Sequence, residues 1–195
     1  MTPEAAPGSM DAICGETGVM WNTREVSQAL QIYGPPRSIY LHVDASQAPF
    51  TENLTRAHFG ADLLVFDGGK VGVRGIGCLI TPRTIPLAPL YGGGGQERGL
   101  RSGTENVEAA TLFAHALIRA AGERETFLPR ARQAREGLIT RLARISNLAV
   151  NEGSSQAPNI LSVSLPGRDT DYLVALLEEV GFAVSTRSAC ETDSV

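Results

Sequence analysis

Lys70 is the residue of this chain best suited to covalent chemistry, because it is the only lysine among the 17 lysine and arginine residues. A lysine amine can lose its proton and attack a carbonyl carbon, whereas an arginine guanidinium stays charged. Taken alone, a single lysine is interpreted most simply as a solvated loop residue. Lys70 follows the apolar run 63–66 and two glycines, and α/β enzymes place ligand-binding groups at the ends of such buried strands. This setting favours a reactive amine.

A carboxylate is predicted to lie near Lys70. Residues 39–46 form an apolar run whose polar residues gather at the C-terminal end, as is typical of a buried strand. A crossover over 48–60 leads to a second apolar strand over 61–67, so the two strands should be parallel. The C-terminal ends of parallel strands share one edge of a sheet, which brings Asp44 toward Lys70.

The segment 91–104 combines glycines with two arginines, Arg98 and Arg101, and with the hydroxyls of Ser102 and Thr104. Backbone N–H groups without side chains over them, next to guanidinium groups, suit an anionic ligand such as a phosphate. The plainer interpretation of this segment is a flexible surface loop. Thr104 also stands where it could cap the helix predicted after it.

The three cysteines, Cys14, Cys78 and Cys190, are far apart in the chain. Their spacing suggests neither a disulfide framework nor a zinc site, so no metal is predicted. Cys78 lies in an apolar run and is predicted to be a small, buried strand residue. Cys190 lies outside any such run and remains the candidate for thiol chemistry.

The remaining elements follow from periodicity and from glycine and proline breaks. Residues 1–9 are rich in small residues and are predicted to be irregular. Helices are predicted at 23–33, 107–121, 128–145 and 170–180, and strands at 76–81, 148–151, 159–165 and 182–185. A chain of 195 residues accommodates one full domain and a smaller or partial second one. The pattern after residue 147 indicates a separate small α/β unit.

Composition excludes some classes of function. The net charge is −4 and the arginines of 119–144 follow the wet face of a helix, so no electrostatic footprint for nucleic acid is present. No apolar run approaches the roughly 18–20 residues that cross a bilayer, and the N-terminus lacks a signal pattern. We therefore predict a cytoplasmic protein with neither a nucleic acid nor a membrane as its partner.

Four segments in one order resemble the cysteine desulfurases, pyridoxal-phosphate enzymes of the class V aminotransferase group. They are residues 42–47, residues 67–70 followed by 75–77, residues 93–104 and residues 188–190. The resemblance implies an α/β fold, that of a fold-type-I pyridoxal-phosphate-dependent transferase with a mainly parallel sheet. Residues 1–125 would form part of its cofactor-binding large domain. Residues 126–195 would form a connecting helix and the start of a small α/β domain that carries the cysteine loop.

The resemblance also assigns roles to single residues. Lys70 would hold pyridoxal 5'-phosphate covalently and move a proton at the α-carbon of the substrate. Asp44 would pair with the ring nitrogen of the cofactor, and Gln47 would hydrogen-bond its phenolic oxygen. Thr104 would reach the phosphate of the cofactor in the neighbouring subunit, which implies a homodimer with shared sites.

Cys190 would attack the sulfur of the substrate L-cysteine, leaving alanine and an enzyme persulfide. The sulfur would then pass to an acceptor protein such as an iron–sulfur scaffold or a thiolation relay. Two alternatives stay open. Another class V enzyme, a selenocysteine lyase or an aminotransferase, would use Asp44 and Lys70 without needing Cys190. A non-catalytic partner would instead dimerise with a complete desulfurase and contribute the loop that carries Thr104.

The chain departs from the family pattern at the phosphate site. Gly69 stands where the family usually has a histidine that helps to bind phosphate, and Asp67 replaces a common serine. A carboxylate beside a phosphate is unfavourable unless it is protonated or turned away. Cys14 stands where the family usually has an asparagine. Because the resemblance starts part-way through the family's large domain and stops just after Cys190, we expect a fragment that lacks the family's N-terminal and C-terminal portions.

Overall fold

The chain forms two compact units. The computed structural model describes residues 6–33 and 39–186. One unit comprises Met1–Ala12 and Trp21–Glu125, and the other comprises Ile13–Met20 and Thr126–Val195. The second unit therefore takes a short piece of chain from within the first hundred residues.

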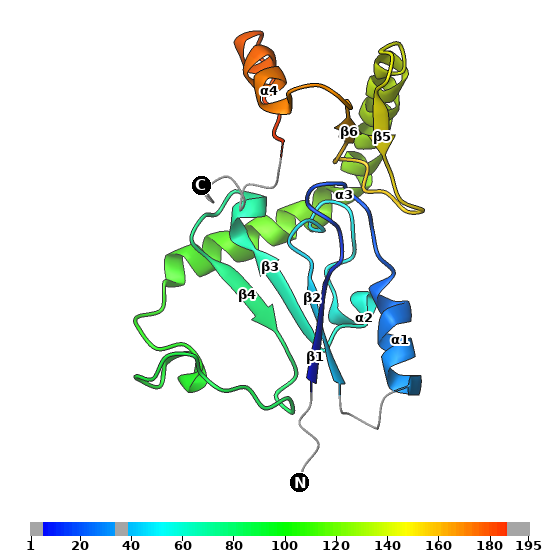
Figure 1. The fold of residues 1–195 in the computed structure, drawn as a ribbon. Helices are drawn as coiled ribbons and strands as arrows, with labels where there is room; N and C mark the ends of the chain where they lie inside the picture. The colour runs from blue at the N-terminus through cyan, green and yellow to red at the C-terminus, as the bar shows by residue number, and fades with distance from the viewer. Residues whose placement is uncertain (1–5, 34–38, 187–195) are drawn as a thin grey trace. The chain divides into compact units, whose positions relative to one another are not determined.

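A four-stranded sheet organises the first unit (Figure 1). Its strands are, in spatial order, β1 (Ala6–Asp11), β2 (Ile39–Asp44), β3 (Leu63–Asp67) and β4 (Gly77–Ile80). The first three strands are parallel and β4 runs antiparallel to β3, so the predicted parallel pair is confirmed. The prediction that residues 1–9 are irregular is wrong from Ala6 onward, because β1 pairs with β2 along its whole length.

One face of this sheet is buried. Leu41 and Val43 of β2 and Leu64 and Phe66 of β3 are at most 2% exposed. They alternate with less buried residues along each strand, because successive side chains point to opposite faces. Burying one such side chain contributes about 1.5–3 kcal/mol. A slip of either strand by one residue would turn its two buried side chains to the opposite face, so the buried face fixes the register of β2 against β3.

Two short helices support the start of the sheet. α1 (Thr23–Tyr33) contacts β2, and α2 (Arg56–Phe59) contacts α1. Thr55 caps α2 with its side chain, and Gly60 ends it in the left-handed conformation at φ 63°. This sharp end lets the chain leave α2 and enter β3 within three residues.

The helix α3 (Val107–Leu142) is continuous. Two helices are predicted in this region, at 107–121 and 128–145, and that division is wrong. Pro129 lies inside the helix and removes one backbone donor. Strong helix formers surround it and carry the helical conformation through.

Asn106 rather than Thr104 caps the start of α3. The Asn106 Oδ1 accepts a hydrogen bond from Ala109 N at 3.0 Å, so the predicted cap at Thr104 is wrong and its hydroxyl stays available for another role. In Figure 1 the first part of α3 passes behind β3 and β4. This part buries a stripe of side chains at helical spacing: Phe113, Ala116 and Ala120.

The second unit contains a two-stranded antiparallel sheet and one helix. β5 (Ala149–Asn151) pairs with β6 (Ser162–Ser164), and α4 (Thr170–Glu179) follows. Asp169 caps α4, because its Oδ1 accepts from Tyr172 N at 3.1 Å. The predicted strand at 182–185 is wrong, since these residues join no ladder in the described part of the chain.

Residues 13–20 join this second unit through backbone hydrogen bonds. Met20 N donates to Ser155 O at 3.0 Å, and Ala157 N donates to Gly18 O at 2.8 Å. A bridge between Val19 and Gln156 completes the contact, and a bridge between Ile13 and Met20 closes the segment on itself. Because these bonds join backbone groups, the pattern of side chains along the sequence did not reveal them.

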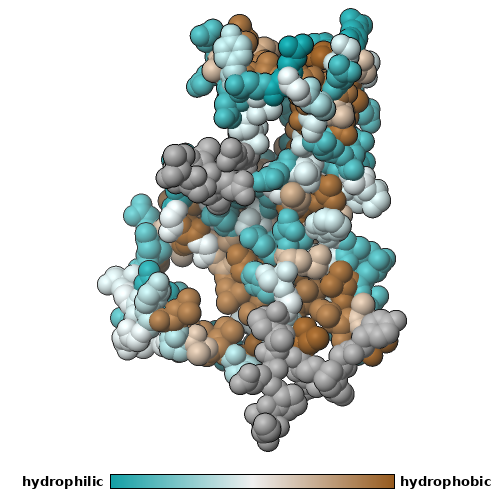
Figure 2. All heavy atoms as spheres, viewed as in Figure 1, coloured by the Kyte–Doolittle hydropathy of each residue, from teal (hydrophilic) through white to brown (hydrophobic). Residues whose placement is uncertain are grey.

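The viewed surface mixes apolar and polar residues (Figure 2). Leu79 and Ile80 of β4 are 46% and 42% exposed, because β4 is the last strand of its sheet. Among the residues that the structure describes, no helix combines the length and apolarity needed to cross a membrane. The same residues contain no group of histidine, cysteine and acidic side chains that could hold a metal ion.

Candidate active site

The candidate site begins where β2 and β3 end. Asp44 is the last residue of β2 and lies opposite Val65 in β3. Ala45 N then donates to Val65 O at 2.9 Å, which continues the ladder one step beyond β2. Asp67 is the last residue of β3, and the turn that carries Lys70 follows it directly. The two strands therefore deliver Asp44 and the lysine turn to one edge of the sheet.

Side-chain hydrogen bonds join the two strand ends. Asp44 Oδ1 accepts from Ser46 N at 2.8 Å. Ser46 Oγ accepts from Asp67 N at 3.0 Å. Asp67 Oδ1 in turn accepts from Gly69 N at 2.9 Å. This row of bonds runs from the carboxylate after β2 to the residue that precedes Lys70.

Lys70 lies in the short 3-10 helix η1 (Gly68–Val71). Gly72 ends this turn at φ 88°, and its N–H donates to the carbonyls of Gly68 and Gly69. Val71 is 5% exposed and anchors the turn, whereas Lys70 is exposed. Within residues 6–33 and 39–186 no hydrogen bond or ion pair holds the Lys70 amine.

Gly68 is required by its surroundings. Its N–H donates to Ile76 O at 2.8 Å, and Val73 N donates to its carbonyl at 2.8 Å. A Cβ at this position would overlap the carbonyl oxygens of both Val73 and Ile76. Glycine thus lets the lysine turn fold back on the chain that leads into β4.

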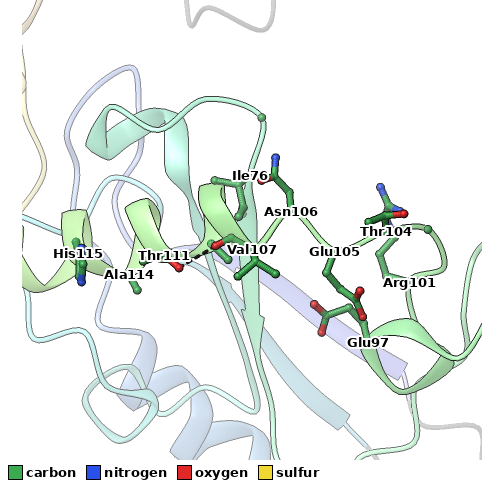
Figure 3. A pocket seen from close by; sticks show the side chains of 14 residues that line it. Ile76, Glu97, Arg101, Thr104, Glu105, Asn106, Val107, Thr111, Ala114 and His115 are labelled. Atoms are coloured by element: carbon green, nitrogen blue, oxygen red, sulfur yellow. Dashed lines mark hydrogen bonds between the residues drawn. The ribbon is translucent and has the colours of Figure 1, made fainter.

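Thr104 lies in a groove of the first unit with a volume of about 690 Å³. The groove is lined by the chain entering β4, by the glycine-rich loop and by the start of α3. Figure 3 shows Arg101 and Thr104 on the loop side, close to the carboxylates of Glu97 and Glu105. The groove is therefore of mixed charge, and of the two arginines that the sequence pattern emphasises only Arg101 lines it.

The structure brings some of the predicted site residues together and leaves others apart. The segments of Asp44 and Lys70 are joined by the hydrogen bonds above. Gln47 is half-buried in the crossover that follows β2. Neither these three residues nor Asp67 line the groove of Thr104. Cys190 lies outside the described residues.

Cys78 lies in β4 opposite Phe66. Burial raises the pKa of the Cys78 thiol, and a hydrogen bond from the Phe66 backbone only partly offsets this effect. A raised pKa keeps the group as a neutral thiol, which is a poor nucleophile. Cys78 therefore lies in a strand as predicted, but it is half-buried rather than buried.

Two features of the site escape the sequence analysis: the bond from Ser46 to Asp67, and the use of Asp67 as a cap. The second has a sequence signal, because an aspartate two residues before a glycine often accepts a bond from its N–H. The first has none. It depends on the register of β2 against β3, which brings together two residues that are 21 positions apart.

Comparison with known proteins identifies the family. The model of the aminotransferase class-V family matches residues 9–194. Cysteine desulfurase IscS 1 of Archaeoglobus fulgidus is 30% identical over 182 residues, which are 92% of this chain and 46% of that protein. Cysteine desulfurase IscS of Salmonella arizonae is 36% identical over 163 residues, 82% of this chain and 40% of that protein.

A solved structure agrees with these relatives. A NifS-like protein superposes with a TM-score of 0.87 at 30% identity, over 94% of this chain and 50% of that one. The predicted α/β fold with a mainly parallel sheet is therefore confirmed. The chain spans less than half the length of the two curated relatives. The match over residues 9–194 shows that the chain belongs to the class V aminotransferase family, whose members depend on pyridoxal phosphate.

Proposed function

We propose that this chain carries the cofactor lysine and the ring-nitrogen carboxylate of a pyridoxal-phosphate enzyme that removes sulfur from L-cysteine. The observation that carries the proposal is the row of hydrogen bonds from Asp44 through Ser46 and Asp67 to the lysine turn. The two curated relatives are both named cysteine desulfurases, which supports this substrate.

The described residues fit the ring of this cofactor. Asp44 is exposed, and Ser46 N engages only one of its two carboxylate oxygens. The other oxygen can accept a hydrogen bond from a protonated ring nitrogen. The Lys70 amine is exposed and can reach an aldehyde. At the phosphate end Asp67 contributes a carboxyl group, and its Oδ1 accepts a hydrogen bond from Gly69 N.

The residues of this chain divide the work on L-cysteine. Bound pyridoxal phosphate supplies an electron sink for the pair left when the α-carbon loses its proton. Asp44 holds the proton on the ring nitrogen that makes this sink effective. Lys70 would hold the aldehyde carbon of the cofactor through its amine and, once the substrate amine has replaced it there, would take the proton from the substrate α-carbon. Gln47 donates a hydrogen bond to the phenolic oxygen and so keeps the ring oriented.

Cys190 completes the proposed reaction as its nucleophile. Its thiolate forms a bond to the substrate sulfur while the bond from that sulfur to the β-carbon breaks. The electron pair of the broken bond stays on the substrate, which takes up protons and leaves as L-alanine. One enzyme thiol and one L-cysteine thus give one persulfide and one L-alanine. The persulfide sulfur then passes to a thiol of an acceptor protein.

Borohydride trapping tests the proposal at Lys70. Reduction in the presence of pyridoxal phosphate should attach a pyridoxyl group to this residue, and peptide mapping should find it there. Lys70→Ala should remove the label. Lys70→Arg is the matched control, because it keeps the positive charge but lacks a reactive amine. An unlabelled Lys70 in the unsubstituted protein would contradict the proposal.

A second measurement separates desulfuration from the chemistry of other class V enzymes. Cys190→Ala should abolish persulfide formation from L-cysteine while cofactor labelling at Lys70 continues. Selenocysteine and a keto-acid acceptor are the comparison substrates. Persulfide-independent release of selenium, or amino-group transfer to the keto acid, would assign the site to a selenocysteine lyase or an aminotransferase instead.

A further inference from the structure

Ser46 links the two segments that carry Asp44 and Lys70. Its N–H donates to Asp44 Oδ1 at 2.8 Å, and its Oγ accepts from Asp67 N at 3.0 Å. Asp67 then caps the lysine turn by accepting from Gly69 N at 2.9 Å. Ser46 is only 8% exposed, so water has little access to replace its bonds. A single buried hydroxyl joins the end of β2 to the turn after β3.

This bond lies where the backbone pairing of the strands stops. The bond from Ala45 N to Val65 O, at 2.9 Å, continues the ladder past β2. The Ser46 hydroxyl then adds the next bond between the two segments, using a side chain in place of a carbonyl. Two glycines follow Asp67 directly, and glycine restrains the backbone less than any other residue. The position of Asp67 therefore decides where the turn begins.

We propose that Ser46 is a positioning residue whose hydroxyl sets the place of the Lys70 amine relative to the Asp44 carboxylate. The inference rests on the proposed function, in which these two groups act on one bound cofactor. A lysine displaced from its place still has a normal amine. It reacts more slowly with a cofactor whose ring is held by Asp44, because the reacting atoms meet less often in the right geometry.

A purely structural role for Ser46 makes a different prediction. If the hydroxyl only satisfied the Asp67 N–H, the effect of losing it would be independent of Asp44. A positioning role requires coupling between the two residues. Once Asp44→Asn has removed the carboxylate, the position of the Lys70 amine relative to it no longer affects the reaction. Loss of the Ser46 hydroxyl then lowers the rate little further.

The experiment measures the rate of borohydride-trapped pyridoxal phosphate incorporation at Lys70. Ser46→Ala should lower this rate about tenfold, the factor expected for the loss of one hydrogen bond. Ser46→Thr keeps a hydroxyl and should restore the rate to within about twofold of the unsubstituted protein. Ser46→Ala added to Asp44→Asn should cause less than about a twofold further loss.

Three further measurements make the result specific. Reductive methylation with formaldehyde, followed at Lys70 by peptide mapping, reports the amine itself, because Lys70 is the only lysine and mapping separates it from the N-terminal amine. Ser46→Ala should leave this rate unchanged. Thr51→Val removes another buried hydroxyl of the same crossover, whose Oγ1 donates to Ala48 O at 3.3 Å, and should not slow incorporation. Ser46→Cys replaces the oxygen with a weak acceptor of similar shape, and is the second variant if Ser46→Ala does not fold.

The outcomes are distinguishable. Incorporation at the unsubstituted rate in both Ser46→Ala and Ser46→Cys overturns the positioning role. So does a loss that simply adds to that of Asp44→Asn, or an equal loss in Thr51→Val. Absence of label in the unsubstituted protein overturns the proposed function and this inference with it. Only that last outcome is visible without any substitution.

Discussion

Lys70 stands exposed on a turn whose next residue, Val71, is 5% exposed. The buried valine and the hydrogen bond from Gly69 N to Asp67 Oδ1 hold the turn on both sides of the lysine. A lysine on such a turn has a fixed backbone, while its side chain remains free to react. The contacts of its neighbours therefore distinguish Lys70 from an ordinary solvated loop lysine.

Asp67→Ser should increase the affinity for pyridoxal phosphate. Serine also caps a helical turn well, so the lysine turn should survive. The resemblance assigns this position to the neighbourhood of the phosphate, and removing one negative charge there should lower the Kd about fivefold. Pyridoxal, which lacks the phosphate, is the control and should bind both proteins equally. Equal gains for both ligands would show that charge at this position is not the cause.

The Cys78 thiol should make stability fall at high pH. Burial raises its pKa above the ordinary value of 9.0, so the folded state keeps a proton that the unfolded state loses. This contribution is fully present below pH 9 and is lost as the pH rises toward the folded pKa. Urea unfolding at pH 8 and pH 10 should show a smaller loss of stability in Cys78→Ser. Identical losses in both proteins would contradict the assignment.

Residue types and spacing predicted part of the site and missed the rest. Asp44 and Lys70 could be predicted because polar residues stand at the ends of two apolar runs. This pattern can be recognised in a single sequence. Ser46 could not be found in this way. Its importance comes from a hydrogen bond to Asp67, which exists only once the two strands are in register. The sequence pattern reports the local preference of a segment for helix or strand, whereas this hydrogen bond is a consequence of the pairing of β2 with β3.

At the scale of elements, Gly68 and Gly72 of the lysine turn should differ in how well they tolerate substitution by alanine. A Cβ on Gly68 would overlap backbone oxygens, so Gly68→Ala should destabilise the protein by about 2–3 kcal/mol. At Gly72 nothing lies within 4 Å of a Cβ, and only its φ of 88° is unfavourable. Gly72→Ala should therefore cost about 1–2 kcal/mol. Urea unfolding measures both, and a larger loss in Gly72→Ala would refute this account.

The elements themselves were predictable where periodicity is strong. β2, β3 and α4 agree with their predicted positions, because apolar residues recur at strand or helix spacing. β1 was missed, since pairing with β2 rather than its own composition makes it a strand. The opposite error occurred at 182–185, where an apolar run has no neighbouring strand in the described part of the chain to join.

At the scale of the whole molecule, the proposed homodimer should share its sites between subunits. Thr104 is exposed and does not cap α3, so its hydroxyl is available to a neighbouring subunit. Lys70→Ala and Thr104→Val proteins should each incorporate little pyridoxal phosphate alone. Mixed after dissociation, they should regain about a quarter of the sites, because each mixed dimer holds one intact pair. Borohydride trapping measures the recovery.

Two outcomes would argue against shared sites. If the mixture recovers nothing, Thr104 acts within its own subunit, and if Thr104→Val protein alone is labelled normally, Thr104 does not act on the cofactor. If the unsubstituted protein sediments as a monomer at micromolar concentration, the homodimer itself is wrong. A mixture of unsubstituted and Lys70→Ala protein is the matched control, because it fixes the label expected when no site is repaired.

Residues 13–20 leave the first unit and pair with backbone groups near residue 156, then the chain returns. No single cut in the gene can therefore separate the two units cleanly. A product that starts at residue 126 would leave the Ser155 carbonyl without the Met20 N–H and the Ala157 N–H without the Gly18 carbonyl. To express the second unit alone, residues 13–20 should instead be joined to the segment that starts at residue 126 through a short glycine–serine linker.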